Sequence, residues 1–274
     1  MNGSVPERGK VLITGGTSGL GFRLVKYFLE KGCNVVATGR KNLALPEYGD
    51  RFTLLITDFS NLKQTSDAVK KICRNHKFDL VINNAGVLSP PDLLLTDDGL
   101  EYTFQVNFLS HLMINEIILM NSEPGRNLMI AAIVSPVYRI AEKDMTIYTM
   151  ASDYGPIKAY SNSKLYLALM CSYLPQKYSA KYLRCIGFDP GVFRSGIYRT
   201  QKKWFRMMYI IGAPLLRNPE KVAVRFGEFI KREDLVDGAI YRSGKGKERL
   251  PVTENQAMNS FWMECKKIIE PYVS

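Results

Sequence analysis

Short apolar runs alternate with amphipathic stretches along most of this chain. The runs are typical of buried strands and lie at 10–14, 34–38, 52–57, 79–83, 127–135 and 182–188. Between them, apolar residues recur at helical spacing over 19–32, 62–75, 99–121 and 156–178. Strands that are apolar throughout and alternate with helices predict an α/β protein with a parallel sheet covered on both faces. Right-handed crossovers make such a sheet doubly wound, with ligands at the carboxyl ends of its strands.

The alternation weakens after residue 190. A helix is expected near 218–231, a short strand near 238–243 and a last helix near 254–269. The chain contains no internal repeat, no low-complexity segment and no linker rich in Pro, Gly or Ser, so residues 1–274 are predicted to form a single domain.

Composition narrows the class of protein. Hydrophobic residues make up 46% and charged residues 23% of the chain, as in an ordinary globular protein. The net charge of +11 suits phosphate-bearing cofactors, anionic membranes or nucleic acid. Nucleic acid is not expected as a partner, because no recognised motif or clustered basic patch is present. The start of the chain lacks the apolar core of a signal peptide, and no run of about 18 apolar residues occurs.

The five cysteines are widely spaced and form no CxxC motif, and the two histidines are not spaced to bind a metal. We therefore expect no metal, no disulfide framework and a cytoplasmic protein. His76 is expected in a solvated loop and His111 in packing contacts.

The stretch "TGGTSGLG" at 14–21 joins the first expected strand to the first expected helix. Glycine permits a tight turn and a close approach of the backbone to a ligand. The start of the helix offers free N–H groups to a phosphate. A dinucleotide site is therefore predicted at Gly15, Thr17, Ser18, Gly19, Leu20 and Gly21.

The second expected strand ends in "ATGRK". An NAD-selective protein usually carries Asp or Glu near this point for the ribose hydroxyls, and none is present here. Arg40, with Lys41 beside it, suits a 2′-phosphate through charge-assisted hydrogen bonds. NADP(H) is therefore predicted in preference to NAD(H).

Together, these features resemble the short-chain dehydrogenase/reductases and their single-domain Rossmann fold. "TGGTSGLG" is similar to the family's TGxxxGxG, "NNAG" at 83–86 to its next signature, and "DPGVFRSG" at 189–196 to its PGxxxT segment, with Ser195 in place of threonine. The long gap between positions 135 and 160 and the C-terminal pattern are most like the retinol dehydrogenase-like branch. The resemblance implies a catalytic tetrad of Asn107, Ser135, Tyr160 and Lys164. It also implies further cofactor contacts at Asp58, Phe59, Asn84, Ala85, Gly86, Pro190, Gly191, Val192 and Ser195, and from Tyr160 and Lys164.

The pentapeptide "YSNSK" at 160–164 suits proton transfer. A free phenol has a pKa near ~10, and a nearby cation lowers it. Lys164 lies four residues after Tyr160, on the same helix face. Tyr160 is thus predicted to be the acid/base, and Lys164 its cationic partner. Ser135 is expected to donate a hydrogen bond to the substrate oxygen. Asn107 is expected to hold a water that relays protons. Tyr138 and Arg139 are expected to line the substrate pocket with Ser135 and Tyr160.

The basic and aromatic stretch at 198–217 leaves three roles open: a lid over a lipophilic substrate, a peripheral membrane contact, or packing. The lid interpretation extends over 197–231. The resemblance also implies a homodimer or homotetramer through the helices near 99–121 and 156–178.

The function predicted from these features is NADPH-dependent reduction of a lipophilic aldehyde or ketone, or the reverse oxidation. The alternatives are a non-catalytic dinucleotide-binding regulator or scaffold, and an enzyme of the same fold acting on acyl thioesters or C=C bonds.

Overall fold

The computed structural model describes residues 8–123, 125–142, 145, 154–178, 182–194, 216–242, 246–250 and 256–274. Within this part of the chain, eight strands form one sheet in the order β3-β2-β1-β4-β5-β6-β7-β8. Their bounds are β1 Lys10–Ile13, β2 Asn34–Gly39, β3 Phe52–Ile56, β4 Leu80–Asn83, β5 Leu128–Ile133, β6 Leu183–Asp189, β7 Ala239–Arg242 and β8 Lys247–Arg249. Only the pairing of β7 with β8 is antiparallel among these strands.

The strand order reverses beside β1. The chain runs outward from β1 to β2 and β3, then returns to place β4 on the other side of β1. The loops after β1 and β4 therefore leave the sheet in opposite directions and open a crevice between them at its carboxyl edge. In an open α/β sheet this is the place where ligands bind.

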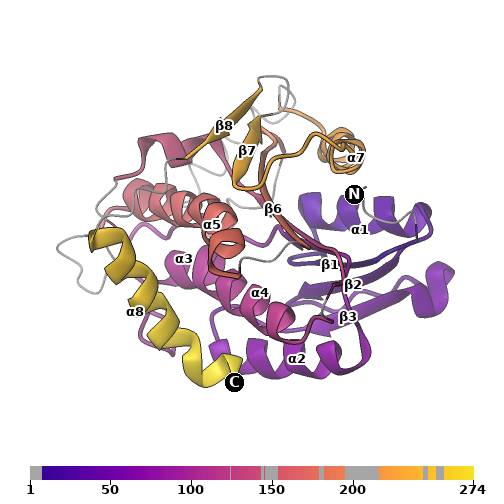
Figure 1. Ribbon diagram of the computed structural model, residues 1–274, viewed down its shortest axis with the longest axis horizontal. Coiled ribbons are helices and arrows are strands. Elements are labelled where there is room, and N and C mark those ends of the chain that lie inside the picture. The colour runs from indigo at the N-terminus through magenta and orange to yellow at the C-terminus, as the bar shows by residue number, and fades with distance from the viewer. Residues whose placement is uncertain are drawn as a thin grey trace.

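Helices cover both faces of the sheet (Figure 1). One face carries α1 and α7, and the other carries α2, α4, α5 and α8. The ring of Tyr27 on α1 packs against Gly227 on α7, where an added Cβ would lie 2.0 Å from it. The helical elements are α1 Gly19–Glu30, η1 Pro46–Arg51, α2 Leu62–Asn75, α3 Tyr102–Phe104, η2 Gln105–Leu109, α4 Ser110–Met120, η3 Pro136–Ile140, α5 Pro156–Tyr178, α7 Pro219–Phe229 and α8 Gln256–Val273.

The C-terminal helix α8 packs across η2 and α5 through aromatic contacts. Phe261 stacks on Phe108 and lies 4.5 Å from the ring of Tyr166, while Trp262 stacks on Tyr173 at 4.0 Å. Residues 110–118 of α4 are buried on every side, including the polar side chains of Ser110, His111, Asn115 and Glu116. The helices expected to form a dimer are thus covered in part by α8 of the same chain, and the oligomeric state stays a prediction.

The structure confirms the α/β class, the doubly wound sheet and every predicted strand and helix, and it adds the short helices η1 and η3, which were not predicted. Two further differences concern a helix and a strand. The helix expected over 99–121 begins at Tyr102 and contains a π-helical turn at Gln105–Leu109. Strand β8 was not predicted, because its three residues, Lys-Glu-Arg, carry no apolar alternation. No helix among the described residues is long and apolar enough to cross a membrane.

The predicted lid over 197–231 is described only in its second half. Residues 197–215 lie outside the described residues. Helix α7 belongs to the layer that covers the sheet beside α1, and the Tyr27 hydroxyl donates to Glu228 Oε1 at 2.6 Å across that contact. The role of the first half as a lid, a membrane contact or packing stays a prediction.

Candidate active site

The turn between β1 and α1 brings its backbone together so closely that only glycine fits at two positions. A Cβ on Gly21 would lie 2.2 Å from the Gly15 carbonyl oxygen, which no side chain could tolerate. Gly15 has a φ of +66° and donates its N–H to Thr38 Oγ1 at 3.2 Å. The turn therefore exposes backbone at the start of α1, as a phosphate cradle requires.

Thr14, the residue before this turn, holds the loop after β4 against the loop after β1. Its Oγ1 accepts the N–H groups of Asn84 and Ala85 at 2.8 and 2.9 Å. The Asn84 side chain donates to the Thr14 carbonyl at 2.8 Å. The two signatures "TGGTSGLG" and "NNAG" are thereby fixed to each other at the crevice.

Asn107 lies in the π-helical turn and bridges two segments of the site. Its Oδ1 accepts the Val87 N–H at 2.7 Å, and its Nδ2 donates to the Val87 carbonyl at 2.9 Å and to Ser163 Oγ at 3.0 Å. Ser163 Oγ in turn donates to the Tyr160 carbonyl at 2.7 Å. π-Bulges often occur at functional sites, and this one holds the loop after β4 at a fixed distance from the start of α5.

Ser135, Tyr160 and Lys164 line one cleft of about 430 Å³. Ser135 follows β5 and starts η3, and its hydroxyl makes no hydrogen bond with any residue that the structure describes. Tyr160 and Lys164 come from the first turns of α5. The cleft also takes in the glycine turn, so the three side chains and that turn share one space.

Lys164 is almost completely buried beside this cleft, with 4% of its surface exposed. Its Nζ donates to the Ile133 carbonyl at 3.4 Å. Burial lowers the pKa of Lys164 to about 8, because removal from water disfavours the charged ammonium. A Cβ on Gly86 would lie 3.3 Å from both Lys164 Nζ and Asn107 Oδ1, so glycine leaves room for both polar groups.

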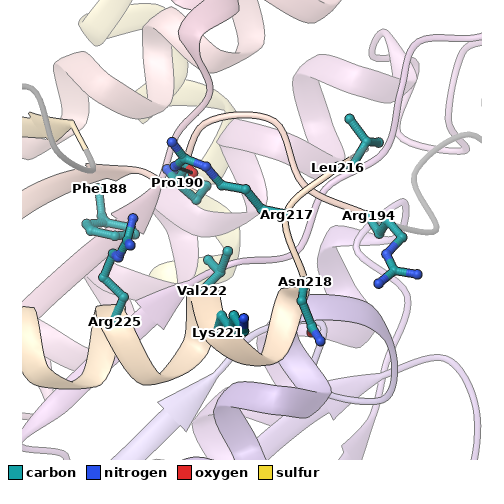
Figure 2. A pocket seen from close by; sticks show the side chains of 9 residues that line it. All are labelled: Phe188, Pro190, Arg194, Leu216, Arg217, Asn218, Lys221, Val222 and Arg225. Atoms are coloured by element: carbon teal, nitrogen blue, oxygen red, sulfur yellow. Dashed lines mark hydrogen bonds between the residues drawn. The ribbon is translucent and has the colours of Figure 1, made fainter. Parts of the chain in front are cut away.

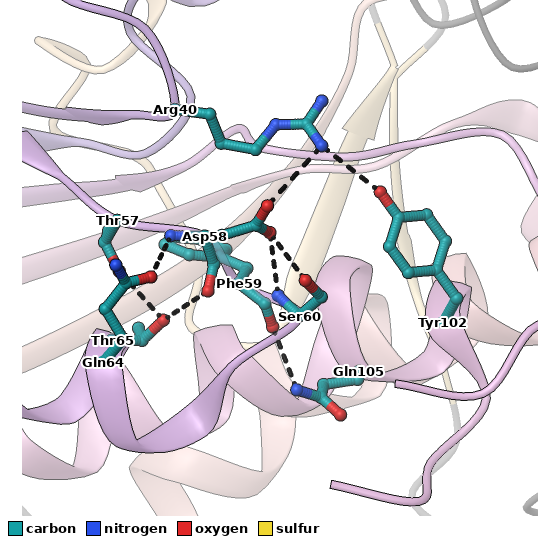
Figure 3. Close-up of polar contacts among 9 residues, drawn as sticks. All are labelled: Arg40, Thr57, Asp58, Phe59, Ser60, Gln64, Thr65, Tyr102 and Gln105. Carbon is teal, nitrogen blue, oxygen red and sulfur yellow. Dashed lines mark hydrogen bonds and ion pairs between the residues drawn. The ribbon is translucent and has the colours of Figure 1, made fainter. Parts of the chain in front are cut away.

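Arg40 projects from the end of β2 over the outer part of the cleft. Figure 3 shows its guanidinium between Asp58 and Tyr102. Nη1 lies 3.7 Å from Asp58 Oδ2 and 3.5 Å from the Tyr102 hydroxyl, and 61% of the side chain is exposed. Asp58 is itself held in place, because its Oδ1 accepts the N–H and the hydroxyl of Ser60. Both contacts of Arg40 are long, so the guanidinium can still reach an anion.

Most of the predicted cofactor residues line this cleft. They are Gly15, Thr17, Ser18, Gly19, Leu20, Gly21, Arg40, Lys41, Asp58, Phe59, Asn84, Ala85, Gly86, Tyr160, Lys164, Gly191 and Val192. Pro190 lies outside it and lines a neighbouring cavity. Ser195 lies outside the described residues.

Tyr138 and Arg139, predicted to contact substrate, do not line the cleft. Tyr138 is 3% exposed and donates its hydroxyl to Glu248 Oε2 at 3.1 Å. Arg139 Nη2 lies 2.5 Å from the same carboxylate oxygen, and its Nη1 lies 3.9 Å from the buried Asp189. Both side chains therefore tie η3 to strand β8.

Several residues that line or support the cleft were not predicted from the sequence. His111 was expected only to pack, but its ring nitrogens lie 2.9 Å from Thr14 Oγ1 and 2.9 Å from the Asn107 carbonyl. The other additional lining residues are largely apolar: Thr38, Gly39, Thr57, Val87, Leu88, Tyr102, Val106, Ile133, Val134, Pro136, Val137 and Phe193. Within the described ranges, no group of three or more His, Cys, Asp or Glu side chains could hold a metal ion.

Comparison with known proteins identifies the class that this fold and cleft define. The model of the short chain dehydrogenase family matches residues 9–205, and the chain belongs to that family. It is similar to human polyprenol dehydrogenase, with 26% identity over 92% of this chain and 82% of the relative. It is also similar to human retinol dehydrogenase 13, with 24% identity over 94% of this chain and 84% of the relative. The predicted likeness to the retinol dehydrogenase-like branch is thereby confirmed.

A solved structure confirms the fold. The 3-ketoacyl-(acyl-carrier-protein) reductase from Brucella melitensis, complexed with NADH, superposes with a TM-score of 0.63. The match covers 85% of this chain and 96% of that chain at 21% identity. At this identity the likeness concerns the fold alone.

Proposed function

We propose that this protein is an NADP(H)-dependent oxidoreductase that interconverts a lipophilic aldehyde or ketone and its alcohol. The observation that carries the proposal is the shared cleft, where Ser135, Tyr160 and Lys164 lie beside a turn in which Gly21 leaves no room for a Cβ. Membership of an oxidoreductase family supports the same reaction class.

The residues of the cleft fit a dinucleotide. The glycine turn and the start of α1 would hold its diphosphate, and Asp58 and Phe59, which also line the cleft, would contact its adenine. When bound, the nicotinamide supplies or accepts the hydride. The end of β2 carries Arg40 where an NAD-selective protein usually has Asp or Glu, and this supports a 2′-phosphate and therefore NADP(H).

In the direction of reduction, the chain's own residues would handle the oxygen of the substrate. The Ser135 hydroxyl would donate a hydrogen bond to the carbonyl oxygen and stabilise its developing negative charge. The Tyr160 phenol would give its proton to that oxygen, leaving an alcohol and a phenolate. The Lys164 cation would stabilise the phenolate. In oxidation, the phenolate would take the proton back.

Asn107 would act mainly by holding neighbouring segments of the site in place. Its side-chain atoms are engaged by Val87 and Ser163, and its carbonyl accepts a hydrogen bond from His111. That carbonyl has a second lone pair, which would accept a hydrogen bond from the predicted water. The relay of protons through this water stays a prediction.

An apolar substrate is supported by two observations. Val87, Leu88, Val137, Val192 and Phe193 line the same cleft as Ser135 and Tyr160. The two human relatives are named for polyprenol and retinol, both of which are long apolar alcohols. We also propose a cytoplasmic location, because all five cysteines are buried and none of them forms a disulfide.

The test is the Tyr160→Phe variant, assayed with NADPH against aldehydes, ketosteroids and retinoids. Loss of a general acid should lower kcat by about 10²–10⁴-fold, while the Kd for NADPH from fluorescence titration stays within about twofold of the wild type. Tyr48→Phe is the matched control, because that ring lies over Arg51 and does not line the cleft. Full turnover by Tyr160→Phe would overturn the assignment.

A further inference from the structure

A second cavity, of about 510 Å³, lies next to the loop that follows β6 (Figure 2). Pro190 and Arg194 of this loop line the second cavity, while Gly191, Val192 and Phe193 between them line the cleft. The opposite wall is formed by Leu216, Arg217 and Asn218 and by the first turns of α7. One short segment thus separates the two spaces.

Cationic side chains dominate the second cavity. Arg194, Arg217, Lys221 and Arg225 line it with Asn218, and none of its nine lining residues is acidic. Arg217 Nη1 donates to the Pro190 carbonyl at 2.8 Å, which fixes that guanidinium at the loop. The Arg194 guanidinium and the Lys221 ammonium form no hydrogen bond or ion pair with any other residue in the described part of the chain.

The stretch of sequence next to the cavity supplies no acidic residue of its own. Between Asp189 and Glu220 the chain contains no Asp or Glu. It contains six cationic residues there, namely Arg194, Arg199, Lys202, Lys203, Arg206 and Arg217. Glu220, the next acid along the chain, lies 4.0 Å from Arg23 on α1 and is not among the lining residues. Arg194, Arg217, Lys221 and Arg225 are all exposed, so an anion that enters the cavity can contact them.

The floor and one end of the cavity add two further features. Phe188 and Val222 are buried and apolar. Helix α7 begins at Pro219 with Asn218 as its cap, so its first turn and its positive dipole end face the same region as Lys221. Cations, a helix start and an apolar floor together suit a phosphate group attached to an apolar or sugar moiety.

We propose that this cavity binds a phosphate monoester or diester, with Arg194 and Lys221 as its free cations and Arg217 as the cation anchored to the loop. The phosphate could belong to a free metabolite or to a phospholipid headgroup, and the chemistry of recognition is the same for both. Pro190 belongs to the loop that also lines the cleft. A ligand in the cavity would therefore contact this loop on the side opposite the cleft.

The experiment measures binding rather than turnover, so its outcome does not depend on the proposed reaction. Inorganic phosphate is titrated by calorimetry in the presence of saturating NADPH, which fills the glycine cradle. The double variant Arg194→Gln/Lys221→Gln is compared with Lys71→Gln/Arg74→Gln, which removes the same charge from exposed positions on α2. Circular dichroism checks that both variants are folded.

We expect Arg194→Gln/Lys221→Gln to weaken phosphate binding by about 10-fold or more, since two charge-assisted hydrogen bonds are lost. The α2 variant should change the Kd by less than about twofold, as expected for screened surface charge. Equal losses in the two variants would show attraction to net charge alone and overturn the site. So would the absence of phosphate binding by the wild type at millimolar concentration.

A second arm distinguishes the sources of the phosphate. Vesicles of phosphatidylcholine with phosphatidic acid are sedimented with each protein, and pure phosphatidylcholine vesicles serve as the blank. A headgroup ligand predicts co-sedimentation that Arg194→Gln/Lys221→Gln loses and Lys71→Gln/Arg74→Gln keeps. Binding of phosphate without co-sedimentation assigns the cavity to a free phosphate compound.

Discussion

Thr14 Oγ1 lies 2.9 Å from His111 Nε2, and this hydrogen bond joins the end of β1 to helix α4. The other ring nitrogen, Nδ1, lies 2.9 Å from the Asn107 carbonyl, which can only accept. Nδ1 therefore carries the proton, and Nε2 accepts from the Thr14 hydroxyl. This direction leaves the Thr14 oxygen free to accept the N–H groups of Asn84 and Ala85. A neutral His111 thus supports the loop that borders the cleft.

The stability of the fold should depend on His111 in acid. Burial lowers the pKa of His111 from 6.5 to about 3, so below pH 6.5 the unfolded chain binds a proton that the folded chain does not. The free energy of unfolding should therefore fall as pH drops through this window, by up to about 1.4 kcal/mol per pH unit. Urea unfolding at pH 7 to 4 should show a shallower fall for His111→Gln than for the wild type.

His76→Gln is the control for this measurement, because it removes the only other histidine and leaves His111 in place. It should keep most of the steep dependence on pH. If His111→Gln and the wild type had parallel profiles, the buried neutral histidine would not be the source of the effect.

Lys164 should have the same kind of effect at alkaline pH. Burial lowers the pKa of its ammonium from 10.5 to about 8. Between these values the unfolded chain is protonated and the folded chain is not, so stability rises with pH from about 8 to 10.5. Over this range, the free energy of unfolding of the cofactor-free wild type should rise by up to about 3 kcal/mol more than that of Lys164→Met. Chemical unfolding at each pH measures it. Lys71→Met, at an exposed position on α2, should reproduce the wild-type profile; a matching profile for Lys164→Met would refute the buried amine.

The sequence predicted those features of the cleft that depend on steric contacts or on residues a few positions apart. Gly21 must be glycine because the Gly15 carbonyl lies against it, and Tyr160 and Lys164 share a helix face through their spacing of four. These requirements lie within a few residues of one another, so the sequence displays them directly. The alternation of apolar runs likewise predicted the sheet, since its central strands β1, β4, β5 and β6 are almost fully buried on both faces.

Contacts between distant positions could not be predicted in this way. Arg139 was expected to face substrate, but its partner Glu248 is 109 residues away on a strand of three polar residues. Strand β8 forms through backbone pairing with β7, which needs no apolar pattern. His111 was rightly expected to be buried, but its bond to Thr14 spans 97 residues and has no local signature. In each case tertiary structure supplies the partner.

Arg40 should select between the two cofactors. Its guanidinium makes only long contacts, at 3.7 Å to Asp58 and 3.5 Å to Tyr102, so it can turn to a 2′-phosphate at little cost. Arg40→Ala should raise the KM for NADPH by about 10-fold, the loss of one charge-assisted contact, and leave that for NADH within about twofold. Steady-state rates with each cofactor measure this, with Arg74→Ala as the control for charge. An unchanged ratio of the two KM values would remove Arg40 from the 2′-phosphate site.

Arg139 and Glu248 should act as a structural pair and not as a substrate contact. Their side chains lie 2.5 Å apart and remain 28% and 40% exposed, so solvent screens much of the attraction. A double-mutant cycle with Arg139→Met and Glu248→Gln should give a coupling in unfolding free energy of about 0.5–1 kcal/mol. The coupling should shrink in 1 M NaCl because the Debye length falls to about 3 Å.

The same variants distinguish this role from substrate binding. Arg139→Met should change the KM for neutral and for acidic carbonyl substrates by the same small factor, because Arg139 does not line the cleft. If Arg139→Met raised the KM for acidic substrates alone and showed no coupling to Glu248, Arg139 would instead be a substrate contact. Since Tyr138 donates to the same carboxylate, Glu248→Gln should also loosen η3 more than Arg139→Met does. Hydrogen exchange of the amides at 136–140, at matched stability, measures that difference.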